Sequence, residues 1–416
     1  MADPNWYHDQ VIFLTGGTGF LGACLLYKLA VQLPTKKIFV LCRGSVQRAI
    51  SKLEAIMPEH VDKILDTRKV QFVVGNICLE NWGFKPSDLQ RLVDEVTTVV
   101  HSAAETSIYV KLPEVIQTNC LSSLRLLRLL TPFHHLKTFL YVSSAFVNIF
   151  VPEAIIQEKS YSAHIANEDA TSTSLETQFH SIIQTGQSPL TAIFPNPYII
   201  SKYLAEKALL HEAPHLPFSV LIVRPSLISP AIRDPHPFFG VNSVTPAYAA
   251  LRMIASNRQH GLERLKREVS PDAVVDEIPV DLVAGVCLAH LAMGTTGTIH
   301  ATGDLYVRIT AHHIAVCLHA NIPPPLREQI LGSGVGEDEA AAEFVFANVK
   351  LYCTDRTFDC RRSAALKLHK GPLGLSLDGH DPVLFSKTRI ERLSRVSPDQ
   401  IRRDQKSNWS RVSLPW

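Results

Sequence analysis

The sequence predicts an α/β fold in which a doubly wound parallel sheet is covered by helices on both faces. Short apolar runs alternate with helix-length segments until about residue 311, and a glycine-rich turn joins the first run to the first helix. Continuous apolar runs are typical of strands that are buried on both faces. The chain of 416 residues is long enough for two or three folding units, so the sheet need not be the whole protein.

The first strand is predicted at residues 11–14, where Val-Ile-Phe-Leu precedes the glycine-rich turn. The helix that follows runs from Gly22 to Leu33, and Pro34 ends it. Further strands are predicted at residues 38–41, 70–74, 96–100, 139–142 and 218–223, and further helices around 121–130 and at 198–211. Because helix-length segments separate these strands, we expect the strands to run parallel.

The α/β alternation ends at about residue 311, so we expect two domains. Residues 1–310 are predicted to form the α/β domain, and residues 311–416 a short, partly helical C-terminal domain. Residues 151–195 are rich in Ser, Thr, Gln and Asn, which is typical of an insertion or lid. Prolines become frequent after Arg224, and we expect a smaller substrate region at 231–275.

Composition argues against several classes of protein. A formal net charge of +2 gives no reason to expect a nucleic-acid partner. Because the N-terminus is polar, we expect no secretory signal, and the most apolar window, residues 139–156, is too interrupted to form a transmembrane segment. The eight cysteines lack C-x-x-C spacing, and the two His-His doublets lack further metal ligands. We therefore expect a cytoplasmic protein with reduced thiols and no metal, of unknown oligomeric state.

The turn TGGTGFLG at residues 15–22 predicts a dinucleotide site. Its glycines form a G-x-x-G-x-x-G array between a strand and a helix, and a second strand ends about twenty residues later. Glycines permit a tight turn and let the backbone approach a pyrophosphate, whose charge is met by the helix N-terminus. The residues expected to contact the cofactor here are Thr15, Gly16, Thr18, Gly19, Phe20, Leu21 and Gly22.

The end of the second strand favours NADPH as the cofactor. Enzymes that use NAD usually carry an acidic residue there, which binds the ribose hydroxyls. This chain has Leu41-Cys42-Arg43 instead, and an arginine suits the 2′-phosphate of NADP. We therefore expect Arg43 to bind that phosphate.

The stretch PNPYIISKYLAEK contains Tyr-x-x-x-Lys twice, as Tyr198 with Lys202 and as Tyr203 with Lys207. Five residues of α-helix turn a side chain by about 140°, so the two tyrosines face different directions and only one pair can serve one site. The prolines just before Tyr198 place it in the first turn of the helix. We therefore expect Tyr198 and Lys202 to be the chemical pair.

The second pair is predicted to be structural. Glu206 precedes Lys207, and adjacent opposite charges are typical of a solvated helix face. The small Ser201 before Lys202 instead allows the first pair's face to pack closely on a cofactor.

These motifs, in this order, resemble the extended short-chain dehydrogenase/reductase superfamily with its Rossmann-type fold. The finer resemblance is to fatty acyl-CoA reductases of the male-sterility type. It rests on TGGTGFLG, VVHSAA, YVSSAFVN, QEKSY, PNPYIISKYLAEK, VRPSLISPAIRDPHPFFGVN and DEIPVDLVAG, which lie between about residues 10 and 305. Residues 43–58 are similar to thioester reductase domains of carboxylic acid reductases and peptide synthetases, and residues 344–367 faintly resemble the family's C-terminal domain.

The resemblance implies Ser144, Tyr198 and Lys202 as catalytic residues and no metal. It also implies that further residues contact NADPH, namely Asn76, Ile77, Ala103, Ala104, Tyr198, Lys202, Pro225 and Ser226. The chain departs from the family's pattern in three places. Asn76 stands where the family usually has Asp, Ser144 where it often has Thr, and residues 239–242 where it has a Trp-Ile-Asp-Asn-like stretch.

The implied reaction is NADPH-dependent reduction of a fatty acyl or polyketide-like acyl thioester of CoA or a carrier protein. We expect Lys202 to lower the pKa of Tyr198 and to hold the nicotinamide ribose, while Ser144 and Tyr198 donate hydrogen bonds to the substrate oxygen. The product is an aldehyde, or an alcohol if a second NADPH reacts. We expect the thioester to be delivered in trans, because no carrier-protein or adenylation segment is recognisable in this sequence.

Three alternatives stay open at this point. The same catalytic trio would serve an extended reductase of a small ketone or aldehyde. A sugar-nucleotide epimerase is disfavoured by Arg43, and a non-catalytic NADP-binding protein would have no need of the trio. Residues 351–416 carry 13 basic and 7 acidic residues, which form either a solvated face or a docking surface for an acidic carrier protein or the phosphates of CoA. We expect Arg361, Arg362, Lys367 and Lys370 to take part in such docking.

Overall fold

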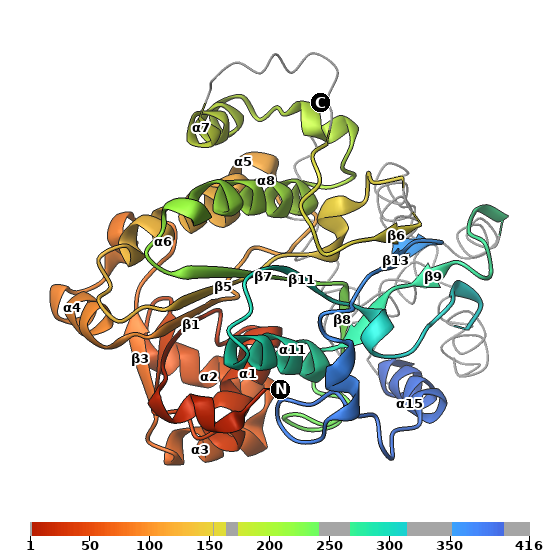
Figure 1. Ribbon diagram of the computed structural model, residues 1–416, viewed down its shortest axis with the longest axis horizontal. Helices are drawn as coiled ribbons and strands as arrows, with labels where there is room; N and C mark the ends of the chain where they lie inside the picture. The colour runs from red at the N-terminus through yellow and green to blue at the C-terminus, as the bar shows by residue number, and fades with distance from the viewer. Residues whose placement is uncertain (1, 153, 164–173, 241–266, 314–351, 395–416) are drawn as a thin grey trace, which may run out of the picture.

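The computed structural model describes residues 2–152, 154–163, 174–240, 267–313 and 352–394, and its centre is a seven-stranded parallel sheet (Figure 1). Along the sheet the strands follow the order β11-β7-β5-β4-β1-β2-β3. Their bounds are β1 Val11–Thr15, β2 Lys37–Cys42, β3 Val70–Val74, β4 Thr98–His101, β5 Thr138–Val142, β7 Ser219–Pro225 and β11 Gly297–Ala301. The chain reverses its direction of travel across the sheet between β1 and β4, where doubly wound folds bind ligands. The predicted Rossmann-type fold is confirmed.

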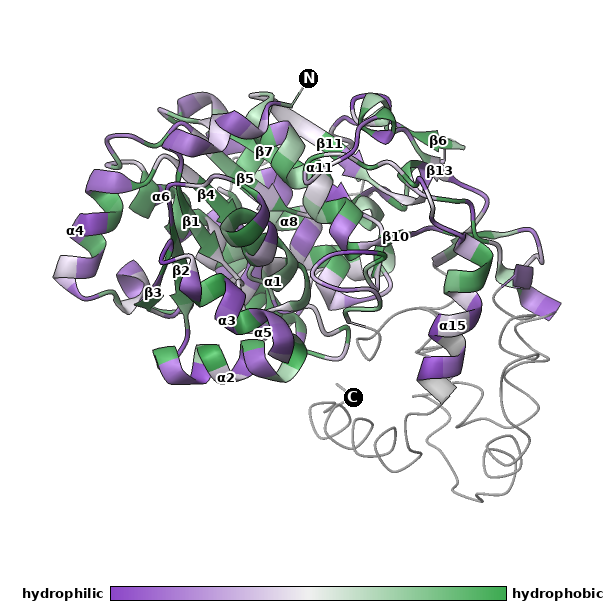
Figure 2. Cartoon of the chain, turned by 90° about the horizontal axis from the view of Figure 1, so that it is seen from below, coloured by the Kyte–Doolittle hydropathy of each residue, from purple (hydrophilic) through white to green (hydrophobic). Residues whose placement is uncertain are grey.

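Helices cover both faces of the sheet and form two hydrophobic cores. One core lies against α1 (Phe20–Tyr27), α2 (Val46–Ile56), α3 (Pro58–Asp66) and α11 (Val280–Ala292). The other lies against α4 (Pro86–Glu95), α5 (Leu112–Val115), α6 (Ser122–Leu130), α7 (Leu175–Thr185) and α8 (Pro197–Glu212). Figure 2 shows hydrophilic and hydrophobic stripes alternating along α2 and α4, as expected of helices with one face in solvent.

The central strand β1 shows why the sheet is apolar throughout. Ile12 and Leu14 are fully buried in the first core, whereas Val11 and Phe13 are buried in the second. Successive side chains of a strand point to opposite faces, so a strand covered on both sides needs an apolar residue at every position.

Most predicted elements lie within a few residues of their observed positions, and the helices differ most. The helix predicted from Gly22 ends as an α-helix at Tyr27 and continues as the π-helical segment η2 (Lys28–Gln32). Strand β4 begins at Thr98 rather than residue 96, and the N–H of Val96 instead caps α4 by donating to the Leu92 carbonyl oxygen (3.1 Å). A second π-helical segment, η4 (Ile116–Leu121), precedes α6.

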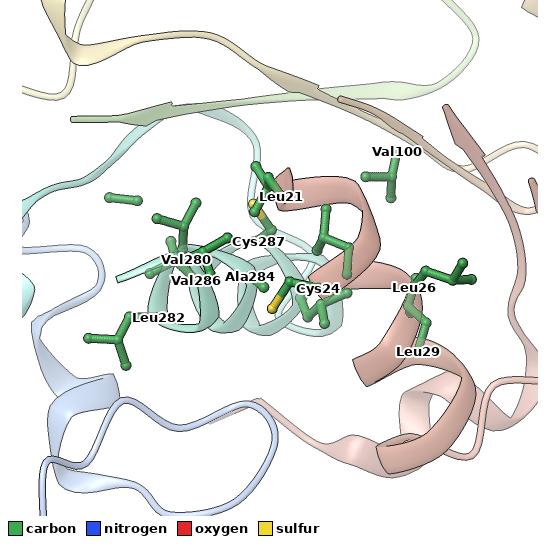
Figure 3. Packing of buried hydrophobic residues seen from close by; sticks show 14 of the residues in the cluster. Leu21, Cys24, Leu26, Leu29, Val100, Val280, Leu282, Ala284, Val286 and Cys287 are labelled. Atoms are coloured by element: carbon green, nitrogen blue, oxygen red, sulfur yellow. The ribbon is translucent and has the colours of Figure 1, made fainter. Parts of the chain in front are cut away.

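Helix α11 and strand β11 were not predicted. Residues of α11 from Val280 to Leu291 are buried, so this helix carries no polar stripe to mark its period. It packs against α1, as Figure 3 shows for Cys24 and Cys287 and the apolar residues around them. On its other side, a Cβ at Gly285 would lie 2.9 Å from the Leu375 side chain of the C-terminal segment.

The described C-terminal residues, 352–394, pack on the α/β part through short strands and apolar contacts. Strand β12 (Cys353–Thr354) pairs with β9 (Val274–Val275), and β13 (Thr357–Phe358) pairs with β6 (Ile155–Ile156). Leu366, Leu373, Leu375 and Phe385 join the core that contains α1 and α11. The remaining elements are β8 (Leu227–Ser229), its partner β10 (Glu277–Pro279) and α15 (Pro382–Ser394). The domain division at residue 310 stays a prediction.

The basic residues singled out in the C-terminal segment have local partners. Arg361 pairs with Asp359 and Lys370 with Asp378, while Arg362 and Lys367 donate to backbone carbonyls of residues 296, 298 and 304. These local contacts are those expected of side chains on a solvated surface. The role of the four side chains in docking stays a prediction. None of the described helices is long and apolar enough to cross a membrane.

Candidate active site

The predicted site residues gather at one edge of the sheet. The glycine-rich turn follows β1, Ala103 and Ala104 follow β4, and Ser144 follows β5. Pro225 and Ser226 lie at the end of β7, where the Ser226 N–H donates to the carbonyl oxygen of Ala301 (3.1 Å). Carboxyl ends of parallel strands share one edge, and ligands of doubly wound sheets bind there.

The glycine-rich turn has no room for side chains. Gly16 has a φ of +74°, and a Cβ there would lie 2.7 Å from the backbone nitrogen of Ala103. A Cβ at Gly22 would lie 2.0 Å from the Gly16 carbonyl oxygen, so the helix can approach the turn only with glycine at this position. Gly19 caps α1 without a side-chain hydrogen bond, which leaves the first N–H groups of the helix for an anion. These residues fit a dinucleotide pyrophosphate.

Two arginines lie where the ribose of that dinucleotide is expected. Arg43 directly follows β2, is exposed, and has no partner among the described residues. Arg48 lies in the first turn of α2 and passes beside Gly44, whose Cβ position would be 3.8 Å from its Nη1. Residues 41–53 contain no acidic residue. The sequence analysis missed Arg48, although its spacing five residues after Arg43 at a helix start was a readable signal.

Tyr198 and Lys202 lie one turn apart at the start of α8. The Asn196 side chain caps this helix by accepting from the Ile199 N–H (3.0 Å), which places half-buried Tyr198 in the first turn. Lys202 is buried, and its Nζ donates to the carbonyl oxygen of Val142 (2.7 Å) and to Tyr141 Oη (3.4 Å). The lysine is thus anchored to β5, two residues before Ser144.

The protonation of this pair differs from expectation. Burial lowers the pKa of Lys202 to about 7. Burial raises the pKa of Tyr198, and the nearby Tyr352 raises it further. The net shift in the pKa of Tyr198 is therefore opposite in direction to the lowering expected from Lys202. The physical reason is that desolvation dominates, while the lysine donates to β5.

Ser144 is held so that its hydroxyl hydrogen is available. The side chain is buried at the N-terminus of the short 3₁₀ helix η5 (Ala145–Asn148). Its Oγ accepts from the backbone N–H of Phe146 (3.3 Å). Because the oxygen accepts in this contact, its own hydrogen remains free to be donated to a substrate oxygen.

The second pair, Tyr203 and Lys207, supports the insertion instead. Tyr203 Oη accepts from the Ala163 N–H (3.0 Å), and Lys207 Nζ donates to Ser160 Oγ (3.2 Å) and Ser162 Oγ (3.0 Å). This geometry gives the pair a structural role.

Glu206 corrects one reason given for that interpretation. It does not lie on a solvated face, because it is buried and accepts from Ser143 Oγ (2.8 Å) and from Arg224 Nε (3.0 Å). Arg224 at the end of β7 is itself fully buried. A buried ion pair therefore ties α8 to β5 and β7 beneath the site.

Two further residues connect the site to its surroundings, and the sequence analysis missed both. Asn119 in η4 is buried and donates to Ser201 Oγ (2.9 Å), directly before Lys202. His101 at the end of β4 is buried, and its Nδ1 lies 2.8 Å from Thr15 Oγ1. Burial and the neighbouring Lys202 lower the pKa of His101 to about 3, so it is neutral. For His101 the available signal was a polar residue at the end of an apolar run, whereas Asn119 lies among other polar residues and carried no such signal.

The structure includes the residues expected at the adenine and one part of the expected acyl site. Asn76 Oδ1 accepts from the Cys78 N–H (3.1 Å), so this oxygen stabilises its own loop, and the contact of Asn76 and Ile77 with adenine stays a prediction. Phe239 packs its ring on Phe20 at 5.4 Å, whereas residues 241 and 242 lie outside the described residues.

Among the described residues, no group of three or more His, Cys, Asp or Glu side chains is placed to hold a metal ion.

Residues 14–287 match the family of male sterility proteins, an NAD-binding family. The chain belongs to the male sterility family. Among curated relatives, this family member is 29% identical to fatty acyl-CoA reductase 1 of Xenopus laevis, over 70% of this chain and 56% of the relative. It is 28% identical to fatty acyl-CoA reductase wat of Drosophila melanogaster, over 55% and 45% of the two chains. The chain spans about half the length of the curated relatives it matches.

Solved structures share the fold of this male sterility family member. The terminal R domain from the myxalamid PKS-NRPS biosynthetic pathway superposes with a TM-score of 0.61 at 20% identity, over 93% of this chain and 90% of that one. Yeast methylglyoxal/isovaleraldehyde reductase Gre2, complexed with NADPH, gives a TM-score of 0.55 at 15% identity, over 95% and 99% of the two chains. The predicted resemblance is confirmed, and the cofactor class is a nicotinamide dinucleotide.

Proposed function

We propose that this protein uses NADPH to reduce an acyl thioester of CoA or of a carrier protein to an aldehyde. The observation that carries the proposal is the placement of Ser144, Tyr198 and buried Lys202 beside the glycine-rich turn at the carboxyl edge of the sheet. The family's relatives named fatty acyl-CoA reductases support the choice of substrate class.

The nicotinamide, when bound, supplies the hydride that adds to the thioester carbonyl carbon. Tyr198 then acts as the acid: burial raises its pKa, so the phenol is protonated at neutral pH and gives its proton to the carbonyl oxygen. Ser144 donates a second hydrogen bond to that oxygen, where negative charge develops. The result is a hemithioacetal and a Tyr198 phenolate.

The same residues complete the reaction. The hemithioacetal hydroxyl returns its proton to Tyr198, the carbon–sulfur bond breaks, and an aldehyde and a thiolate leave. Lys202 is proposed to hold the ribose hydroxyls, since its Nζ is fixed between β5 and the start of α8. The described cysteines are not required, because no acyl-enzyme forms.

NADPH rather than NADH is proposed as the reductant. Arg43 directly follows β2 and Arg48 lies in the first turn of α2, while the acid that would bind the ribose hydroxyls of NAD is absent from residues 41–53. A dianionic 2′-phosphate would be bound by charge-assisted hydrogen bonds from one or both guanidinium groups.

The test is to incubate the purified protein with NADPH and either a series of acyl-CoAs, acyl-carrier proteins or small aldehydes. We expect NADPH oxidation to depend on thioester, with one free thiol released per aldehyde formed. Oxidation by small aldehydes or ketones without any thioester turnover would instead support a small-carbonyl reductase. Tight NADPH binding without oxidation by any substrate would contradict both and support a non-catalytic protein.

A further inference from the structure

Tyr352 of the C-terminal segment contacts Phe146 and Asn196, which are close in sequence to the proposed catalytic Ser144 and Tyr198. Residue 352 directly precedes β12, where Cys353 is in register with Val275 of β9. A few residues later β13 pairs with β6, so the segment is attached at both of its ends. Figure 1 shows β6, β9 and β13 together at one end of the molecule, beyond the sheet.

The Tyr352 ring packs on the turn that holds Ser144. It meets the ring of Phe146 edge to face, with centroids 4.8 Å apart at an angle of 71°. The N–H of Phe146 is the donor to Ser144 Oγ (3.3 Å). Phe358 of the same segment packs on Phe146 as well, at 5.9 Å. Aromatic contacts of this geometry are favourable and directional, so they restrict where Phe146 can lie.

The Tyr352 hydroxyl binds the residue that starts α8. It is hydrogen-bonded to the side chain of Asn196. Asn196 Oδ1 accepts from the Ile199 N–H (3.0 Å). Burial raises the pKa of Tyr352, whereas the bond with Asn196 lowers it, as expected when the amide nitrogen donates to the phenol oxygen. Tyr198, two residues after Asn196, is close enough to Tyr352 for the two phenols to interact electrostatically.

We propose that Tyr352 is a positioning residue of the active site, which joins the start of α8 to the Ser144 turn and so sets the distance between Tyr198 and Ser144. The two donors to the substrate oxygen come from elements more than fifty residues apart in sequence, and Tyr352 contacts the neighbour of each. The C-terminal segment is then part of the active site rather than an appendage. Burial raises the pKa of Tyr352 to about 12, so its hydroxyl stays neutral over the working range of pH.

The proposal rests on the proposed function only for its kinetic test. Tyr352→Phe keeps the ring on Phe146 and removes the bond to Asn196. We expect kcat to fall about tenfold with KM for NADPH unchanged, because misplacing a reacting group is costly. In a protein that already carries Tyr198→Phe, the same change should have no further effect, since residues that act as one unit are not additive.

A second variant removes the hydrogen bond between Tyr352 and Asn196 by changing Asn196 instead of Tyr352. Asn196→Ser retains a good helix cap but lacks the amide donor, so it should reproduce the loss of kcat seen in Tyr352→Phe. The matched control is Tyr306→Phe, which removes a buried hydroxyl that bonds His380 (2.8 Å) away from the site and should leave kcat unchanged. Additive losses in Tyr198→Phe/Tyr352→Phe, or an equal loss in Tyr306→Phe, would overturn the proposal.

Hydrogen–deuterium exchange gives a readout that needs no turnover. Tyr352→Phe should speed exchange in peptides that cover residues 144–148 and 196–200, and Tyr306→Phe should not. Unchanged exchange in both peptides would refute the positioning role even if the enzyme is active. If the wild type shows no thioester activity but exchange in Tyr352→Phe is still faster than in the wild type, the role of Tyr352 is retained and only the proposed substrate is rejected.

Discussion

Lys202 Nζ donates to the carbonyl oxygen of Val142 at 2.7 Å, which fixes the lysine of α8 to the strand that leads to Ser144. This hydrogen bond holds the three residues proposed to act on the substrate at fixed relative positions. Tyr198 lies one helical turn before Lys202, and Ser144 lies two residues after Val142. The bond also removes the ammonium from solvent, which explains why the pKa of Lys202 is lowered to about 7.

Tyr198→Phe should lower thioester reduction by about a hundredfold or more, because the general acid is lost. NADPH affinity, measured by fluorescence titration, should survive. Tyr203→Phe is the matched control, since its hydroxyl accepts from the Ala163 N–H in the insertion, and it should leave the chemical step intact. If Tyr203→Phe abolished turnover and Tyr198→Phe did not, the assignment of the two pairs would be reversed.

Arg43→Ala and Arg48→Ala should each weaken NADPH more than NADH. A charge-assisted contact to the 2′-phosphate contributes about 1.5–3 kcal/mol, so the Kd for NADPH should rise by about tenfold or more. Arg91→Ala, which removes an exposed arginine paired with Asp88 on α4, should change neither Kd. Equal losses for the two cofactors would show that the arginines do not contact the phosphate.

The buried ion pair under the site should contribute strongly to stability. Glu206→Ala leaves fully buried Arg224 without its counter-ion, and we expect a loss of about 3–5 kcal/mol in the free energy of unfolding. Glu176→Ala breaks the exposed pair with Arg128 and should cost at most about 1 kcal/mol. Urea denaturation measures both, and similar losses in the two variants would contradict this account of the pair.

The lysine at the site should make stability depend on pH. Lys202 has a pKa of about 7 in the folded protein and near 10.5 when unfolded, so between these values the unfolded chain binds the extra proton. Its contribution to stability is therefore smallest below pH 7 and recovers as the pH rises toward 10.5, by up to about 1.4 kcal/mol per pH unit. The free energy of unfolding of the wild type should therefore rise relative to that of Lys202→Met as the pH increases from 7 to 10.5.

The control for this pH dependence is an exposed lysine next to the same strand. Lys137→Met, just before β5, should give a difference from wild type that stays flat between pH 7 and 10. A flat difference for Lys202→Met as well would mean that its ammonium is not desolvated in the folded protein.

The sequence by itself determined the sheet and the cofactor turn, because both depend on local patterns. Apolar runs identify strands buried on two faces, and the glycine spacing at 15–22 predicts a turn in which any Cβ would collide. The choice of Tyr198 over Tyr203 could also be predicted from the sequence, since the prolines mark where α8 begins.

Tertiary structure alone decided which groups are buried and which distant segments meet. From the sequence Glu206 is predicted to be a surface charge, whereas in the fold it pairs with Arg224, eighteen residues away. Buried on every side, α11 has no polar face to reveal its period. Tyr352 reaches the start of α8 only because β12 pairs with β9, and such long-range pairing leaves no local mark in the sequence. Burial sets the pKa of Lys202 and Tyr198 for the same reason, since desolvation is a property of the packed fold and not of neighbouring residues in the chain.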